Sequence, residues 1–256
     1  MLAPVLCSSS TSVSAPSSWT PAVAAIAVET AAATTVSQLQ DPATSFQKIA
    51  GLIICSKVKN MKTNNEKNDW TEFYKVTRDK PPSKLLVKAL EYVKYKNKAI
   101  DIGGGALKDT RYLLSLGFDV TVIDDDELMA KEAVKIQPDK LHLVVSSFEN
   151  FNFPSNQFDI ASAMFALPFN PSNTFDKVTK KIKESLVRDG IFCGQLFGIH
   201  DSWNTRQNMT FHTKEQAKEL LKDMESIYFN EEENDGTTAN GTPKHWHIFH
   251  FIVRKT

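Results

Sequence analysis

The sequence predicts an α/β fold: a mostly parallel sheet with helices on both faces. From residue 83 onward, short β-branched runs alternate with segments of helical periodicity, which is typical of such sheets. The last two strand-like runs have no helix between them, which predicts a terminal antiparallel pair. Seven strands are expected, over residues 99–102, 120–123, 141–145, 158–165, 191–197, 226–229 and 246–253.

The helices of the first half are marked by local signals. Apolar residues recur at helical spacing over 85–93, with Ser83 as the expected N-cap. A helix over 110–116 is expected to end at Gly117, and one over 128–136 is stopped by Pro138.

In the second half, a helix over 175–187 is followed by an Asp189-Gly190 turn, and Thr213 is expected to cap a helix that ends at Leu221. Residues 234–243 are interpreted as a polar turn region. The acidic run Glu231-Glu232-Glu233 is interpreted as a solvated strand end, and Cys193 as a core residue.

Composition excludes several classes of protein. The 256 residues carry 30 basic and 30 acidic side chains, so nothing favours binding to nucleic acid or to an anionic membrane. No apolar run reaches about 18 residues, which argues against a transmembrane helix. Cys7, Cys55 and Cys193 show neither metal-ligand spacing nor a disulfide framework, which favours a reducing, cytoplasmic compartment.

The composition changes near residue 60. Residues 1–60 contain five charged side chains and are rich in Ser, Thr and Ala, so they are predicted to form a disordered extension. An organelle transit peptide is the alternative, but it should contain Arg, and this segment has none. Residues 61–256 are predicted to form the folded domain. They keep 30 − 3 = 27 basic and 30 − 2 = 28 acidic residues, which counts against a nucleic-acid substrate.

The first predicted strand ends in the least ordinary segment of the chain, Asp101-Ile102-Gly103-Gly104-Gly105. Glycines let a turn adopt positive φ and let a ligand approach the backbone. Asp124 ends the second strand, where a carboxylate can accept both hydroxyls of a ribose. A plain tight turn and a solvated helix start would explain each piece alone. Together, on neighbouring strand ends, they indicate an adenosine-containing cofactor.

The pattern favours S-adenosylmethionine over a dinucleotide. The dinucleotide fingerprint requires a third glycine where Lys108 stands, and no P-loop occurs. An Asp at position 101 would repel a pyrophosphate but would hold a ligand ammonium, directly or through water.

Residues 70–256 resemble the class I S-adenosylmethionine-dependent methyltransferases, which have a Rossmann-like, doubly wound fold, and among them the tellurite-resistance-like small-molecule branch. The resemblance is carried by five segments: Ala99–Ala106, similar to the family's D-L-G-C-G-x-G; Val122–Asp126; Ser147–Asp159; Met164–Phe169; and Lys244–Phe249.

The resemblance implies cofactor-binding roles residue by residue. Asp101, Gly103, Gly104 and Gly105 would line the methionine end of S-adenosylmethionine, Asp124 would hold the ribose, and Asp125 would lie beside the adenosine. Ser147 and Phe148 would border the adenine, Met164 would close the pocket under the sulfonium, and Arg78 or Lys80 in an amino-terminal lid would face the carboxylate. The chain departs from the family at three places: Gly104 replaces Cys, Leu107-Lys108 replaces Gly-Arg, and Ser147 replaces Asp.

The catalytic residues stay open. His200 and Asp201 follow the fifth strand and are the candidates, with a polar loop as the alternative interpretation. His245 and His247 share a strand face, but no third ligand is evident, so no metal site is expected. Trp203 and Phe169 would either wall a substrate pocket or pack in the core.

The predicted function is therefore methyl transfer from S-adenosylmethionine to a small-molecule acceptor by in-line substitution. The alternatives are a non-catalytic S-adenosylmethionine-binding protein and an NAD-linked oxidoreductase. The sequence leaves open the acceptor, the accepting atom and the oligomeric state.

Overall fold

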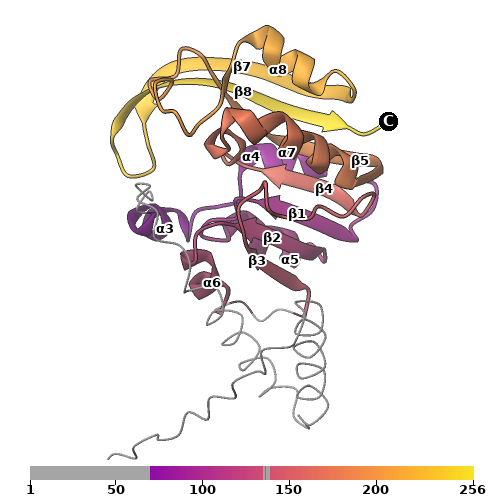
Figure 1. Cartoon of the computed structure of the whole chain (residues 1–256). Helices are drawn as coiled ribbons and strands as arrows, with labels where there is room; N and C mark the ends of the chain where they lie inside the picture. The colour runs from indigo at the N-terminus through magenta and orange to yellow at the C-terminus, as the bar shows by residue number, and fades with distance from the viewer. Residues whose placement is uncertain (1–69, 135, 137–138) are drawn as a thin grey trace, which may run out of the picture. The chain divides into compact units, whose positions relative to one another are not determined.

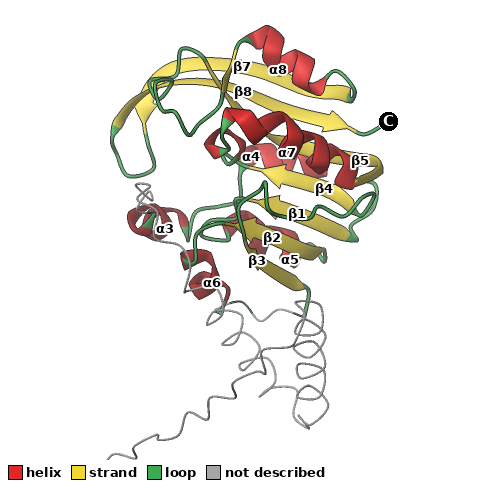
Figure 2. Cartoon of the chain, viewed as in Figure 1, coloured by secondary structure: helices red, strands yellow, loops and turns green. Residues whose placement is uncertain are grey.

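The computed structural model describes residues 70–134, 136 and 139–256. The predicted extension over 1–60 and its boundary lie outside the described residues. Within them, a single sheet has helices on both faces (Figures 1 and 2). No helix in this part of the chain is long and apolar enough to cross a membrane.

The sheet has the strand order β3-β2-β1-β4-β5-β8-β7, and a further short strand, β6, pairs with the end of β5. Strands β1 to β5 are parallel to one another, and β8 runs antiparallel between β5 and β7. The predicted α/β, Rossmann-like class with a terminal antiparallel pair is confirmed. The strands are β1 Lys98–Ile102, β2 Asp119–Asp124, β3 Leu141–Val145, β4 Phe158–Ala163, β5 Leu186–Gly198, β6 Phe211–His212, β7 Glu225–Thr237 and β8 Pro243–Arg254.

The two faces of the sheet bury separate apolar clusters, because alternate residues of a strand point to opposite faces. Ile100 and Ile102 pack with α7 and α8, whereas Ala99 packs with α4 and α5. The helices are α3 Thr71–Thr77, α4 Lys84–Leu90, α5 Lys108–Ser115, α6 Leu128–Ala133, the 3₁₀ helix Leu167–Phe169, α7 Ser172–Ser185 and α8 Lys214–Leu221.

The predicted helix caps have different outcomes. Thr213 caps α8 through a capping box with Gln216, as predicted. Ser83 precedes α4, but its side chain does not cap the helix; the Asp109 carboxylate accepts from both the Ser83 N–H and the Ser83 hydroxyl, each at 2.7 Å. A buried carboxylate 26 residues away in the chain therefore anchors the start of α4.

Two strand predictions were wrong at their ends. The Asp189-Gly190 turn lies inside β5, where Asp189 has a φ of 65° beside an irregularity in the β4–β5 register. Strand β7 continues to Thr237, so the predicted turn region begins too early. The acidic run Glu231–Glu233 lies in the middle of β7, because each of these residues pairs with β8.

Candidate functional site

The carboxyl ends of β1, β2 and β4 meet at one edge of the sheet, and the glycine turn after β1 lies at their junction. Gly103 has a φ of 71°, and a β-carbon there would lie 2.4 Å from Cβ of Ala166, in the loop after β4. The same position is 3.6 Å from Cζ of Phe148. Glycine is required at 103 both by backbone conformation and by this close approach.

Asp124 ties the turn to the end of β2. Its Oδ2 accepts from the Gly105 N–H and its Oδ1 from the Asp126 N–H, each at 2.9 Å. Burial raises the pKa of Asp124, and these two hydrogen bonds oppose that rise. Because each carboxylate oxygen has two lone pairs, both can still accept a ligand hydroxyl.

Asp101 is a buried carboxylate at the end of β1. Thr110 donates its hydroxyl to Oδ2 at 2.6 Å. Burial, followed by the nearby Asp109 carboxylate, raises the pKa of Asp101 to about 7. A bound cation would favour the charged form of Asp101.

The turn enters α5 through a left-handed residue. Leu107 has a φ of 62° at the position where the resembling motif has glycine. Its side chain is fully buried against Val122 and Met129. Apolar burial offsets a backbone strain of about 1–2 kcal/mol. The turn therefore keeps a left-handed residue at this position despite the Leu107-Lys108 departure from the family pattern.

Helix α3 borders the glycine turn. Cε1 of Phe73 lies 3.5 Å from the position of a β-carbon at Gly105. The Tyr74 hydroxyl is buried and has no hydrogen-bond partner among the described residues. Burial and the neighbouring Asp124 raise the pKa of Tyr74 well above its usual value. A buried, unpartnered hydroxyl beside the turn is a site feature that the sequence reasoning missed.

Arg78 and Lys80, the basic residues predicted to face the cofactor carboxylate, differ in their surroundings. Arg78 forms an ion pair with Glu132 of α6, and its Nε is buried without a hydrogen bond to the described residues. Lys80 is exposed. The cofactor-carboxylate role of either residue stays a prediction.

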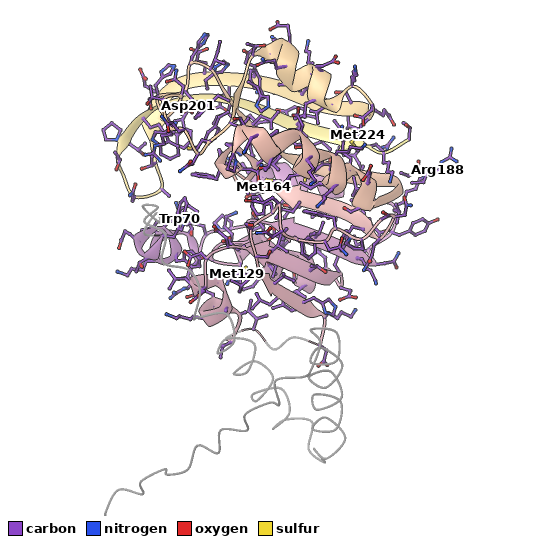
Figure 3. The ribbon with its side chains drawn as sticks, in the orientation of Figure 1. Trp70, Met129, Met164, Arg188, Asp201 and Met224 are labelled. Atoms are coloured by element: carbon purple, nitrogen blue, oxygen red, sulfur yellow. The ribbon has the colours of Figure 1, made fainter. Side chains whose placement is uncertain are left out.

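The remaining predicted cofactor residues lie at the ends of β2, β3 and β4. Asp125 is exposed directly after β2, and Ser147 accepts a hydrogen bond from the Asn150 amide at 2.9 Å. Met164 follows β4 (Figure 3). Its sulfur accepts from the Gln195 amide at 3.7 Å. Gln195, a buried residue absent from the sequence prediction, also accepts from the Phe165 N–H at 2.8 Å.

Aromatic side chains line the next part of this edge. Phe165 is 41% exposed, has a φ of 56°, and lies 6.1 Å from the Trp246 ring. Phe169 lies 6.1 Å from Trp203 and 5.3 Å from Trp70 of the α3 segment. Trp203 and Phe169 also pack against a buried apolar cluster, so both contribute to the core. Phe165 presents the most exposed ring of the group.

Asp201 is fully buried, and its carboxylate already has partners within the protein. The carboxylate of Asp201, which is labelled in Figure 3, forms an ion pair with Lys244 and accepts the Trp203 N–H at 2.9 Å. The Lys244 ammonium lies 4.2 Å from the centroids of both the Trp203 and Trp246 rings. Asp201 therefore holds the loop after β5 against β8.

His200 is exposed and lies beside two groups from the β7–β8 pair, Glu233 and His247. Its Nδ1 is 3.2 Å from Glu233 Oε2, and its ring stacks on His247 with centroids 4.8 Å apart. Glu233 Oε1 also lies 3.3 Å from His245 Nε2. A third metal-ligating group was not evident from the sequence. In the structure Glu233 provides such a group, because β7 extends past Phe229 and pairs Glu233 with His247.

Three solved structures of other proteins share this fold. A SAM-dependent methyltransferase from Methanosarcina mazei aligns with a TM-score of 0.51 and 19% identity, covering 65% of this chain and 96% of its own. TehB from Haemophilus influenzae aligns with a TM-score of 0.55 and 17% identity, covering 67% and 61%. The 1,6-didemethyltoxoflavin-N1-methyltransferase from Burkholderia thailandensis, with S-adenosylhomocysteine bound, aligns with a TM-score of 0.51 and 18% identity, covering 76% and 93%.

The fold is thus that of the class I S-adenosylmethionine-dependent methyltransferases. Residues 100–194, from β1 through most of β5, match the family described as "Methyltransferase domain". No curated protein is detectably similar to the chain in sequence. Residues 100–194 therefore carry a methyltransferase domain, as predicted, on a fold shared with S-adenosylmethionine-dependent methyltransferases.

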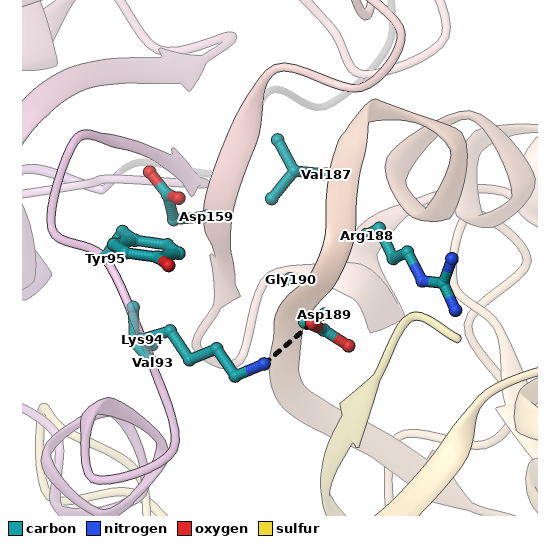
Figure 4. A pocket seen from close by; sticks show the side chains of 8 residues that line it. All are labelled: Val93, Lys94, Tyr95, Asp159, Val187, Arg188, Asp189 and Gly190. Atoms are coloured by element: carbon teal, nitrogen blue, oxygen red, sulfur yellow. Dashed lines mark hydrogen bonds and ion pairs between the residues drawn. The ribbon is translucent and has the colours of Figure 1, made fainter.

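A small cavity at the other end of the sheet is unrelated to this site. It is lined by Tyr95 before β1, by Asp159 at the start of β4 and by Gly190 early in β5 (Figure 4). These positions are at the amino ends of the parallel strands. A volume of about 30 Å³ is far too small for a nucleoside.

Proposed function

We propose that the chain transfers a methyl group from S-adenosylmethionine to a small-molecule acceptor by in-line substitution. The observation that carries this proposal is the convergence of the buried Asp101, the glycine turn and Asp124 at neighbouring strand ends. Bound S-adenosylmethionine would supply an electrophilic methyl group on a positively charged sulfonium.

The residues at the turn fit the cofactor in chemical type. Asp101 would hold the ammonium, since an ionised carboxylate in a buried position needs a cationic partner. Asp124 would accept the ribose hydroxyls through its remaining lone pairs. The Tyr74 hydroxyl and the Arg78 Nε, both buried without partners among the described residues, would donate to the cofactor carboxylate.

The groups proposed to bind the adenine end would make weaker contacts with the cofactor. Phe148 would pack on the ring and Met164 would border the sulfonium, with Asp125 beside the adenosine. Ser147 would contact the adenine amino group, but a neutral hydroxyl gives a weaker hydrogen bond than the Asp common in the family.

Gly104 of the glycine turn leaves no room for a side chain, because a β-carbon there would lie 2.2 Å from Cγ2 of Val122.

The aromatic residues after β4 support a small acceptor. Phe165 would stack on it, with Trp246 beside it and Phe169 and Trp70 as the opposite wall. The neighbour from Burkholderia thailandensis binds 1,6-didemethyltoxoflavin, a small molecule, on the same fold. Membership of the tellurite-resistance-like branch is part of the proposal, supported by the Lys244–Phe249 segment, and it does not identify the acceptor.

His200 is the remaining candidate for contact with the acceptor, since its ring is exposed at the functional edge. Asp201 would act by positioning, because its carboxylate is buried against Lys244. A thiol or other soft acceptor needs little base, whereas an alcohol or amine would need its proton removed.

The test has two stages. Isothermal titration calorimetry with S-adenosylmethionine and with NADH measures cofactor preference, and the proposal requires binding of the first and not of the second. A labelled-methyl transfer assay against a metabolite extract, with mass spectrometry of the product, then identifies the acceptor. Tight cofactor binding with no labelled product from any extract would favour the non-catalytic alternative.

A further inference from the structure

A cluster of metal-ligating side chains lies outside the cofactor residues, on the β7–β8 pair and the loop after β5. It consists of His200, Glu233 and His247, here called the rim triad. One potential ligand atom from each of the three lies within 4.8 Å of the others. The triad joins residues that are 33 and 47 positions apart in the chain, so only the folded protein assembles it.

His247 is the fixed member of the triad. Its side chain is 3% exposed, and its ring packs closely against Gly198. A β-carbon at Gly198 would lie 2.1 Å from His247 Nδ1, so only glycine leaves room for the ring. Nδ1 accepts the His200 backbone N–H at 3.2 Å, a hydrogen bond that a metal ion on Nδ1 would replace. The other nitrogen, Nε2, is 3.1 Å from Glu231 Oε1. Metal-bound histidines are commonly oriented by such a carboxylate on their second nitrogen.

The other two members can move. The side chains of His200 and Glu233 are 58% and 42% exposed, and they already lie 3.2 Å apart. Around a zinc ion, with bonds of about 2.0–2.2 Å, ligand atoms come closer than 4.8 Å, so the triad must contract. Rotation of two exposed side chains toward the fixed His247 would provide that contraction.

The Glu233 carboxylate of the rim triad also contacts His245. His245 Nε2 lies 3.3 Å from Glu233 Oε1, and His245 Nδ1 lies 2.8 Å from Asp235 Oδ1. Glu233 can therefore keep a hydrogen bond from His245 on one oxygen while the other binds a metal. Two imidazoles and one carboxylate suit a borderline divalent metal such as zinc or cobalt.

We propose that the rim triad binds a divalent transition-metal ion of the zinc type. Three protein ligands leave an open coordination position for water or for an anionic or thiol ligand. The inference goes beyond the proposed function and does not depend on it, because metal binding is measured without cofactor or acceptor.

Zinc titration of the metal-free full-length protein tests the proposal, with His200→Ala and Glu233→Gln as site variants. The matched controls are His142→Ala on β3 and Glu219→Gln on α8, both exposed and each paired with a residue outside the triad. Circular dichroism confirms that every variant is folded. We expect one zinc ion per wild-type chain, with affinity reduced about tenfold or more in both site variants and unchanged in both controls.

Cobalt substitution adds an independent readout. The visible spectrum of the Co²⁺ form should show nitrogen and oxygen coordination without a thiolate charge-transfer band, and both site variants should lose it. A thiolate band, zinc affinity unchanged in both site variants, or no zinc binding by the wild type would each overturn the proposal.

Discussion

The Gly105 backbone donates its N–H to Oδ2 of Asp124 at 2.9 Å, which joins the glycine turn after β1 to the end of β2. The two residues are 19 positions apart, and the parallel pairing of Ile102 with Ile123 brings them together. The carboxylate proposed to bind the ribose thus also holds the turn proposed to bind the methionine end.

Replacing Asp124 with Ala removes the proposed ribose acceptor and leaves two backbone N–H groups without their partner. We expect S-adenosylmethionine affinity to fall by about tenfold or more, equivalent to about 1.4 kcal/mol or more. Calorimetry measures the change, and Asp223→Ala, at an exposed position after α8, is the control. Unchanged affinity in Asp124→Ala would rule out the ribose assignment.

Cofactor affinity should depend on pH through Asp101. Its pKa is raised to about 7 in the free protein, and a bound ammonium favours the ionised form. Binding below pH 7 must therefore release a proton, so affinity should rise with pH, by up to about tenfold per unit, and level off above pH 7. Calorimetry in buffers of different ionisation enthalpy measures the released proton. Asp101→Asn should bind more weakly and lose the pH dependence.

Gly103→Ala should destabilise the protein more than Gly117→Ala. Both positions have positive φ, at 71° and 93°, so each substitution costs about 1 kcal/mol in backbone strain. Only at Gly103 does the new β-carbon also meet a neighbour, Ala166, whereas nothing lies within 4 Å at Gly117. Urea unfolding measures the free energy of unfolding of the two variants. Equal losses would show that the loop after β4 moves away from the new β-carbon without cost.

The buried pair of Asp201 and Lys244 should be strongly coupled. Lys244→Met leaves a buried carboxylate without its cation, at a cost of about 3–5 kcal/mol of unfolding free energy. The double variant Asp201→Asn/Lys244→Met should lose clearly less than the sum of the two single variants. Chemical denaturation of all four proteins gives the coupling energy, and strict additivity would contradict the ion-pair interpretation.

His212 should make the fold sensitive to acid. Burial lowers its pKa from 6.5 to about 4, so between these values the unfolded chain binds the proton more readily than the folded one. Stability should therefore be lost as pH falls from 6.5 toward 4, by up to about 3 kcal/mol. In His212→Phe, which keeps an aromatic group against Phe175, this part of the loss should be absent from urea titrations at pH 4.5 and 7.

Much of the sheet edge that carries the glycine turn was predictable because its signals are local. The β-branched run of β2, the glycines after β1 and the Thr213 capping box each depend on residues close together in sequence. Leu107 shows where this reasoning ends. A leucine there gives no sign of a left-handed turn, and only its burial against Val122 and Met129 stabilises that conformation.

The sequence by itself determined the α/β class and the order of most strands and helices, and it is the source of the prediction that Asp101 and Asp124 bind the cofactor. Only the tertiary structure decided the extent of β7, the partner of Asp201 and the assembly of the rim triad. Residues 231–236 are polar and exposed, so they show no strand periodicity, and pairing with β8 alone makes them a strand. Contacts such as Glu233 with His200 depend on that register, which sequence spacing does not specify.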